Sequence, residues 1–426
     1  MADLFLGIDI GTGGVRACAI DADGSIRALT AAALTPPLQH GHAIDQDPEL
    51  WWQATVSAIR KLGETVDLGR IDRIAVDGTS GTLLLVDAAG RPCSPGLMYN
   101  DARATAAAAR IADVVPRESG AHGPSSALAK LLHLLGRGEA RNARHAVHQA
   151  DWIAGRLGGC HGISDENNAL KLGYDPVARA WPAWLDQLGV ARELLPKVLV
   201  PGMPFANVDP PMASAIGLPA SARVAAGTTD GVAAFIATGA HRPGDAVTSL
   251  GTTLVVKMLA AQPIFAPDDG VYSHRLGNRW LVGGASNTGG AALLMHFSAQ
   301  EMERMTPELR PAEPTGLDYY PLPRPGERFP IADPKLAARL TPIPAENHIF
   351  FQALLEGIAS VEADAYRHLA LLGAPALRRV ISIGGGAKND AWTAIRRRIL
   401  AVPVSTAEHT EACYGAALLA LRGLQA

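Results

Sequence analysis

Two glycine–threonine turns, one in each half of the chain, are the residues whose types and spacing most clearly indicate chemistry. Gly11 and Thr12 follow the apolar run 4–10, and Gly251 and Thr252 follow the run 247–250. Glycine lets the backbone approach a ligand closely, and successive N–H groups in such a turn form a nest for phosphate oxygens. Two facing turns of this kind could hold a nucleotide polyphosphate from two sides, which predicts a phosphoryl-transfer enzyme with two lobes.

Asp9 ends the apolar strand that leads into the first turn. A carboxylate at this position could hold Mg²⁺, directly or through water, while Gly11 and Thr12 approach the phosphates. Aspartate beside glycine is also common in ordinary turns. Because an aspartate in a buried strand followed by Gly-Thr-Gly-Gly is unusual for a turn alone, the sequence favours the functional interpretation.

Other glycine-rich phosphate motifs fit less well. A dinucleotide-binding fingerprint would need glycine where Arg16 stands and a helix where a strand is predicted, and the chain has no Walker A motif. The loop 384–386 follows the strand 379–383 and fits better against a nucleobase or a ribose, with Asn389 and Trp392 able to bond or stack. A plain strand-to-helix turn explains this loop equally well.

Asp230 lies between a predicted strand at 223–226 and a predicted helix at 231–239. A carboxylate at this position could take the proton of an acceptor alcohol during phosphoryl transfer. Aspartate is also a favoured helix N-cap. The residue pattern leaves the two roles of Asp230 equally open.

A set of short polar side chains follows other predicted strands of the first half, namely Asp77, Thr79, Ser80, Asn100, Asp101 and Arg103. Such side chains could bind the hydroxyl groups of a polyol at fixed positions, although ordinary turn chemistry explains each of them as well. The thirteen histidines show no metal-binding spacing, and His145 and His148 are expected on a solvated helix face.

The elements that must position these residues alternate between strands and helices. Strands are predicted at 4–20 (as a hairpin), 26–34, 71–76, 83–86, 223–226, 247–256, 379–383 and 402–405, and helices at 48–63, 103–113, 126–136, 149–157, 231–239, 346–371, from 390, and 411–423. The proline-rich segment 307–346 is predicted to be a loop outside the core. The loosely repeated order predicts a duplicated α/β fold with a cleft between its lobes.

Composition limits the possible classes of protein. A chain of 426 residues is too long for one hydrophobic core, which predicts two domains. A net charge of −3 without a basic cluster argues against nucleic acid and anionic membranes as partners. The four scattered cysteines predict neither disulfides nor a zinc site, and the absence of a leader-like N-terminal segment predicts a cytoplasmic protein.

With these residues in place, the chain resembles the FGGY carbohydrate kinase family, within the actin-like ATPase (ribonuclease H-like) fold. The resemblance rests on eight runs in the same order, at 7–12, 46–52, 77–82, 99–103, 227–230, 250–253, 325–330 and 384–389. Two signatures are incomplete, because His133 replaces a tryptophan and 353–358 matches only in part. The resemblance covers nearly the whole chain and implies a two-lobed α/β fold.

The resemblance also implies roles for individual residues. Asp230 would be the catalytic base, and Asp9 would lie beside the metal and the transferred phosphate, so that both carboxylates serve a Mg²⁺ site. The phosphates of ATP would lie on Gly11, Thr12, Gly251 and Thr252, and its nucleoside on Gly385, Gly386, Asn389 and Trp392. The sugar would contact Thr79, Ser80, Asp101 and Asp230.

The implied organisation is a sugar-binding lobe at 1–237, with the helix in 406–426 packing back on it, and a nucleotide-binding lobe at 238–405. The expected reaction is ATP-dependent phosphorylation of a ketopentose, D-ribulose above all, because xylulokinases tend to carry Met-His where Thr79 and Ser80 stand. D-xylulose, L-ribulose and a polyol such as glycerol are alternative acceptors. A non-catalytic actin-like ATP-binding protein and an ATPase with weak sugar transfer are alternative functions, and a homodimer is a possible assembly.

Overall fold

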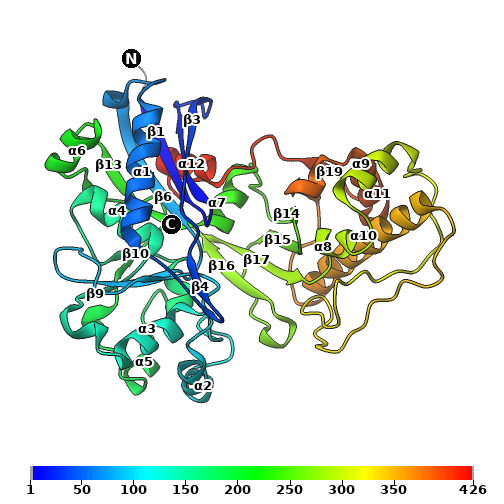
Figure 1. Ribbon diagram of the computed structural model, residues 1–426, viewed down its shortest axis with the longest axis horizontal. Coiled ribbons are helices and arrows are strands. Elements are labelled where there is room, and N and C mark those ends of the chain that lie inside the picture. The colour runs from blue at the N-terminus through cyan, green and yellow to red at the C-terminus, as the bar shows by residue number, and fades with distance from the viewer. Residues whose placement is uncertain (1–2, 425–426) are drawn as a thin grey trace. The chain divides into compact units, whose positions relative to one another are not determined.

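The computed structural model describes residues 3–424 of the chain (Figure 1). These residues form two compact units. Unit 1 contains the chain up to Ala237, the short segment His274–Asn278 and the residues from Glu411 onward. Unit 2 contains Thr238–Ser273 and Arg279–Thr410.

Unit 1 is built on a six-stranded sheet with the strand order β12-β13-β6-β1-β2-β3. Its strands are β1 (Leu4–Ile10), β2 (Gly14–Ile20), β3 (Ile26–Ala33), β6 (Ile71–Gly78), β12 (Pro204–Asn207) and β13 (Arg223–Thr229). The first three strands form an antiparallel meander, whereas β6 runs parallel to both β1 and β13. Every residue of β1 is buried, as expected for a central strand that is covered on both faces.

Helix α1 (Pro48–Leu62) shows how the local sequence sets the element boundaries. The Asp47 side chain accepts a hydrogen bond from the Glu49 backbone N–H and caps the first turn, while Pro48 occupies the first helical position. The helix ends at Gly63. Its apolar face, which includes Trp51, packs on β2 and β3.

Helix α12 (Ala412–Arg422) returns from the end of the chain to the sheet of unit 1 and packs on β1 (Figure 1). Its backbone approaches β1 so closely that a Cβ atom on Gly7 would lie 1.9 Å from the carbonyl oxygen of Cys413. Cys413 also lies beside Cys18 of β2, and the contact with this thiol together with burial raises the pKa of Cys413. The fold therefore brings together two cysteines that are far apart in the sequence.

Unit 2 repeats the strand pattern of unit 1. Its sheet runs β17-β15-β14-β18-β19, with β14 (Asp245–Leu250), β15 (Leu254–Ala260), β17 (Arg279–Ser286), β18 (Arg379–Ile383) and β19 (Val404–Thr406). Strands β14, β15 and β17 form the antiparallel meander, and β18 lies parallel to β14 and β19. The same order of antiparallel and parallel pairs in both sheets confirms the predicted duplicated α/β fold.

The remaining strands are mostly short additions. Unit 1 holds a second sheet, β4 (Leu38–His40), β5 (Ala43–Gln46), β8 (Gly96–Leu97), β7 (Leu83–Val86) and β9 (His145–His148), and a parallel pair, β10 (Ile163–Asp165) with β11 (Lys197–Leu199). Strand β16 (Tyr272–Leu276) neighbours β17.

The other helices are α2 (Thr105–Val114), α3 (Ala127–Gly136), α4 (Gln149–Gly158), α5 (Trp184–Gln187), α6 (Pro210–Ile216), α7 (Asp230–Ala237), α8 (Gly290–Leu294), α9 (Ala299–Met305), α10 (Asn347–Leu371) and α11 (Asp390–Leu400). Among residues 3–424, the structure holds no helix that is both long and apolar enough to cross a membrane.

The segment 307–346 corrects one prediction. As expected, it contains little regular structure beyond a short 3₁₀ turn and isolated bridges. However, Tyr319 and Phe329 are buried to 2% and 1% exposure and pack into the core of unit 2. The segment therefore contributes to the core, because its aromatic side chains cover apolar surface even though its prolines prevent a helix.

The close approach at Gly7 gives a stability prediction. Gly7→Ala should lower the free energy of unfolding by about 2–4 kcal/mol, because the new methyl group meets backbone atoms of α12 that cannot move aside singly. Gly13→Ala is the matched control, since a Cβ there meets no atom within 4 Å. Urea unfolding of both variants measures the difference, and equal stability of the two would contradict the predicted packing.

Candidate functional site

Three aspartates gather at one edge of the main sheet of unit 1. Strands β1, β6 and β13 are parallel neighbours, and their register pairs Asp9 with Asp77 and Asp77 with Thr228. Asp230 follows directly as the first residue of α7. Because parallel strands end at the same edge, ligands of open α/β sheets usually bind there. The topology thus unites Asp9 and Asp230, which were predicted as site residues, with Asp77.

These carboxyl groups lie in a poorly solvated setting. Asp9 is 4% exposed and Asp77 is fully buried, whereas Asp230 is half-buried. Burial and the charges of Asp9 and Asp230 raise the pKa of Asp77 well above its ordinary value. Burial also raises the pKa of Asp9, against the effect of Arg16, whose guanidinium lies 3.2 Å from Asp9 Oδ2. Burial and the mutual repulsion of these groups therefore act against ionisation of all three carboxyl groups at once.

The donor set at this edge fits Mg²⁺ that arrives with phosphate groups. Carboxylate oxygens are the ligands that Mg²⁺ prefers, and it commonly takes one or two of them together with waters and substrate phosphates. The buried Asp77 lies within hydrogen-bonding reach of Asp9, a contact that acts to raise the pKa of Asp77 and to lower that of Asp9, and neither Asp77 oxygen bonds to any other group within residues 3–424. No cluster of three or more His, Cys, Asp or Glu among these residues is arranged to bind a metal by itself. This donor set therefore suits an ion shared with a nucleotide.

The first glycine turn joins β1 to β2 next to Asp9. The N–H of Gly11 donates to the carbonyl of Gly14 at 3.0 Å, and Thr12 is exposed at the tip of the turn. A Cβ on Gly11 would meet no atom of the chain closer than 3.5 Å, so packing within the protein does not require glycine at this position. The space beside Gly11 is compatible with the predicted approach of a phosphate.

The loop from Thr79 to Thr82 borders this carboxylate edge and is held from several sides. Thr79 donates its backbone N–H and its hydroxyl to Gln149 Oε1, and its hydroxyl also lies 2.6 Å from that of Thr82. Lys130 donates to the carbonyl of Gly81 at 2.7 Å. Thr79, which was predicted to contact the sugar, is therefore occupied by internal bonds.

The second lysine at this loop is Lys171, whose ammonium donates to the carbonyl of Ser80 at 3.3 Å. Burial lowers its pKa, while the negative charge of Asp230 acts in the opposite direction, so the two side chains are close enough to interact. Burial and the charge of Lys171 lower the pKa of Lys130 to about 7. Ser80 is partly exposed, so it keeps a surface that a ligand can reach.

Asp101, the other residue predicted to contact the sugar, is fully buried. Its carboxylate accepts from the backbone N–H of Ile44 and pairs with the Arg103 guanidinium, which also bonds to Asp45 at 2.6 Å. These bonds tie the loop after β8 to β5. In this structure the Asp101 carboxylate is therefore engaged inside the protein, where its charge also acts on the pKa of Lys130.

Sequence reasoning missed three residues of this region, Gln149, Lys130 and Lys171. A signal for the lysines was present, since both interrupt apolar runs, at 127–135 and 169–172, where a charged residue is seldom buried without a partner. Gln149 carried no such signal. Its role depends on β9 running beside β7, which places it next to Thr79.

Behind the loop lies a buried polar network around Asp165, at the end of β10. Asp165 accepts bonds from the backbone N–H groups of Asn167 and Asn168 and from the Asn168 side chain. Burial, and then the charge of Asp151, raise the pKa of Asp165 to about 8. The Asn167 side chain donates to Thr228 Oγ1 at 3.1 Å, which connects the network to the strand before Asp230.

His148 corrects a prediction. It was expected on a solvated helix face, yet it ends strand β9, has no exposed surface, and its Nδ1 lies 2.9 Å from Asp151 Oδ2. His145, at the start of the same strand, is partly buried. The prediction failed because β9 forms by pairing with β7, a strand about sixty residues earlier in the chain, which a local pattern does not show.

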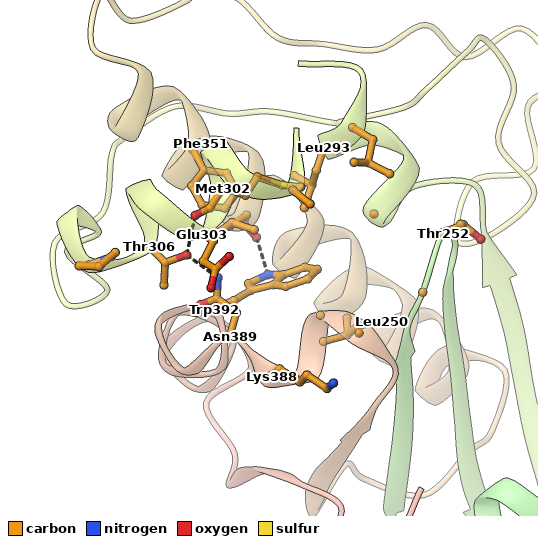
Figure 2. Close-up of a pocket in the computed structure, with 18 residues that line it drawn as sticks. Leu250, Thr252, Leu293, Met302, Glu303, Thr306, Phe351, Lys388, Asn389 and Trp392 are labelled. Carbon is orange, nitrogen blue, oxygen red and sulfur yellow. Dashed lines mark hydrogen bonds between the residues drawn. The ribbon is translucent and has the colours of Figure 1, made fainter. Parts of the chain in front are cut away.

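In unit 2, the predicted nucleotide-binding residues converge on one pocket of about 690 Å³ (Figure 2). Six of them line it: Gly251, Thr252, Gly385, Gly386, Asn389 and Trp392. Strands β14 and β18 are parallel and pair Ser249 with Ile383, so the turns that follow both strands leave the same edge of the sheet. Most of the remaining lining is apolar, including Leu293, Met302 and Phe351.

The Gly251–Thr252 turn joins β14 to β15, as the first glycine turn joins β1 to β2, but it is one residue tighter. The Gly251 N–H donates to the carbonyl of Thr253, and the carbonyl of Gly251 accepts from the N–H of Gly290 at 2.8 Å. Helix α8 therefore begins directly against the turn. A Cβ on Gly290 would lie 2.8 Å from the Gly251 oxygen, which accounts for glycine at the start of α8.

Asn389 and Trp392 support the wall of the pocket. The Asn389 side chain caps α11 by accepting from the Trp392 N–H, and its amide donates to Thr306 Oγ1. Trp392 is 3% exposed and donates its indole N–H to the carbonyl of Leu355. A Cβ on Gly386 would lie 2.4 Å from the Trp392 ring. Both predicted side chains thus border the pocket, but their hydrogen-bonding groups are used within the protein.

Comparisons with known proteins agree with this architecture. The model for the N-terminal domain of the FGGY family of carbohydrate kinases matches residues 4–237, and the model for its C-terminal domain matches residues 246–424. The chain is 27% identical to the xylulose kinase of Escherichia coli over 91% of this chain and 83% of that protein. It is 22% identical to the gluconokinase of Bacillus subtilis over 99% of this chain and 88% of that protein.

Among solved structures, a xyloylose kinase from Brucella ovis superimposes with a TM-score of 0.90 at 26% identity, covering 99% of this chain and 91% of the other. This similarity, together with the duplicated sheets, confirms the predicted two-domain α/β fold of the actin-like ATPase type.

The raised pKa of Asp165 gives a pH-dependent prediction. Between about pH 4 and pH 8, the folded state keeps a proton on Asp165 that the unfolded chain releases, so the free energy of unfolding falls as pH rises. Asp165→Asn removes this dependence, and Asn168 can turn its otherwise unpaired Oδ1 toward the new amide. The free energy of unfolding of the variant minus that of the original chain should therefore be at least about 1 kcal/mol higher at pH 8.5 than at pH 5.

Urea unfolding at the two pH values measures this change. The exposed Asp23→Asn serves as the control, and its difference from the original chain should not change with pH in the same way. An Asp165→Asn variant whose stability difference is the same at pH 5 and pH 8.5 would show that this carboxyl group is ionised throughout.

Proposed function

We propose that this chain, which belongs to the FGGY family of carbohydrate kinases and is an ATP-dependent sugar kinase, phosphorylates the terminal hydroxyl of a ketopentose, with D-ribulose as the preferred acceptor. The observation that carries the proposed chemistry is the convergence of Asp9, Asp77 and Asp230 at the ends of three parallel strands. A phosphoryl transfer needs a proton acceptor and a cation site close together, and this edge offers carboxylates for both.

Asp230 is the proposed general base. Its position at the first turn of α7 leaves the side chain half-buried, and its Oδ1 accepts from the adjacent Gly231 N–H at 2.6 Å, which orients the carboxylate. Lys171 lies close enough for their charges to interact. We assign proton removal from the terminal hydroxyl to Asp230. In phosphoryl transfer the protein mainly positions the reactants and stabilises charge, and a carboxylate accepts the proton of the attacking hydroxyl.

Asp9 and Asp230 are the proposed carboxylates for Mg²⁺, with Asp77 behind them. A bound Mg²⁺ would offset the negative charge of the phosphoryl oxygens during transfer. Arg16 orients Asp9 through its 3.2 Å contact and bonds at the same time to Glu411. The N–H groups of the Gly11–Thr12 turn are proposed to receive phosphate oxygens on the same side of Asp9.

The pocket of unit 2 is the proposed site of the nucleotide. The Gly251–Thr252 turn at one end suits phosphates, and the apolar walls beyond it suit a flat base (Figure 2). A volume of about 690 Å³ lies within the range expected for a ligand of this size. Transfer requires the terminal phosphate of the bound nucleotide to reach the carboxylates of unit 1.

The ketopentose assignment is supported by the short side chains of the loop 79–82 and by the run 99–103, which resemble those of D-ribulose kinases. Ser80 and Lys171 are the proposed sugar contacts beside Asp230, because Ser80 is partly exposed and Lys171 keeps N–H donors beyond its bond to the Ser80 carbonyl. Thr79 and Asp101, by contrast, make several hydrogen bonds inside the protein. D-xylulose is the second candidate, since relatives named xylulose kinase match more than nine-tenths of the chain.

Replacement of the proposed base tests the mechanism. Asp230→Asn should lower kcat by about 10²–10⁴-fold, because the amide cannot accept the proton, while ADP should bind about as tightly as before. Coupled ADP release measures kcat, and calorimetry measures nucleotide binding.

Asp67→Asn is the control for this variant, since Asp67 caps a short helix elsewhere in unit 1 and should keep normal turnover. If Asp230→Asn retained wild-type kcat, Asp230 would be only a helix-capping residue.

A panel of acceptors tests the sugar. D-ribulose, D-xylulose, L-ribulose, L-xylulose and glycerol are compared by kcat/KM, with ADP release in the absence of sugar as the baseline. D-ribulose should exceed D-xylulose by about tenfold or more, because a hydroxyl of the wrong configuration leaves a polar partner unpaired. A higher kcat/KM for D-xylulose would establish the second candidate, and release independent of any sugar would indicate an ATPase.

A further inference from the structure

The end of the unit 2 pocket that lies away from the Gly251–Thr252 turn contains one charged side chain that makes no bond within residues 3–424. The two charged side chains among the residues lining the pocket are Glu303 and Lys388. Glu303, an exposed residue of α9, makes no hydrogen bond or ion pair of normal geometry with any described residue, so its carboxylate is free to bind a ligand in the pocket. In Figure 2 its carboxylate lies on the Thr306 side of Trp392, whereas Thr252 lies on the opposite side.

The neighbouring polar side chains already make hydrogen bonds within the protein. Thr306 donates its hydroxyl to the carbonyl of Met302 and accepts from Asn389. The Asn389 oxygen caps α11, and the indole N–H of Trp392 is bound to Leu355. A ligand that enters this end therefore meets apolar side chains, polar groups that are partly used within the protein, and one carboxylate whose acceptor capacity is entirely unused by the described residues.

From this arrangement we infer that Glu303 is the residue that reads the base, by accepting a hydrogen bond from an exocyclic amino group such as that of adenine. The inference rests on the proposed nucleotide assignment of this pocket. A base that enters the pocket displaces water from the side of the Glu303 carboxylate that faces the pocket, and a carboxylate that loses water without gaining a donor is destabilised. An amino group on the base restores one hydrogen bond, whereas a base without one leaves the charge unsatisfied.

The position of Glu303 relative to the glycine turn favours the base over the other parts of the nucleotide. Phosphates would be repelled by a carboxylate, and the Gly251–Thr252 turn that suits them lies on the other side of Trp392 (Figure 2). Lys388, the remaining charged lining residue, carries the charge that suits phosphates. A ribose contact remains chemically reasonable for a carboxylate, and the experiment below separates it from the base contact.

Calorimetric titration of the full chain with three ligands, in the absence of sugar, provides the test. ADP, purine riboside 5′-diphosphate (which lacks the 6-amino group) and 2′-deoxy-ADP are compared on the original chain, Glu303→Leu, Glu303→Gln and the control Glu408→Gln. Glu408 is an exposed glutamate of unit 2 outside the pocket lining, so its replacement makes the same change of charge.

The original chain should bind ADP about tenfold or more tightly than the purine riboside diphosphate. Glu303→Leu should remove this preference for both ADP and 2′-deoxy-ADP. Glu303→Gln keeps an acceptor oxygen and should retain part of the preference, and Glu408→Gln should retain all of it.

Equal binding of ADP and the purine analogue to the original chain would overturn the inference. So would a preference that survives in Glu303→Leu, or an effect of Glu303→Leu on ADP that is absent for 2′-deoxy-ADP, which would indicate a ribose contact. These results are independent of the sugar panel. A chain that phosphorylates no sugar but shows the expected ADP preference would refute the acceptor proposal alone, whereas a chain that binds no ADP would refute both assignments.

Discussion

The parallel pairing of a few central strands is the constraint on which the carboxylate edge of unit 1 and the pocket of unit 2 both depend. In unit 1, β1, β6 and β13 run side by side, so the residues at their ends, Asp9, Asp77 and Asp230, must lie at one edge. In unit 2, the pairing of β14 with β18 brings two glycine-rich turns to one edge in the same way. A shift of one residue in either register would turn the corresponding side chains to the other face of the sheet.

This geometry explains why most polar side chains near the two sites form hydrogen bonds within the protein, so that few remain available to a ligand. Parallel edges concentrate backbone groups and carboxylates that need partners when buried. Lys130, Gln149 and Asp101 use their side chains to hold loops in place. In unit 2 the fully buried Arg396 is paired with Glu362 at 2.6 Å and bonds to Ser382 of β18, which ties α10 and α11 to the sheet. Ser80 and Glu303, by contrast, keep exposed surface, which is why the proposed contacts to sugar and base are assigned to them.

The sequence predicted the elements well where local signals were strong. Capping residues located both ends of α1, and the apolar runs located β1, β2 and β18, because these signals lie within a few residues of the structure they determine. It failed at His148 and in the segment 307–346. Strand β9 depends on pairing with β7, and the aromatic residues of the segment are buried by contacts with distant parts of unit 2. Neither cause is visible in a local pattern.

The residues of this protein by themselves determined the two glycine turns, Asp9, Asp230 and the family resemblance, since these depend on residue type and short spacing. Only the tertiary structure decided that Asp77 joins the two aspartates, that Lys130, Lys171 and Gln149 hold the loop beside them, and that Asn389 and Trp392 use their polar atoms within the protein. The physical reason is that a side chain's role depends on which partners reach it. Apart from the local cap of Asn389 on Trp392, the hydrogen-bond partners of these side chains lie 37 to 91 residues away along the chain.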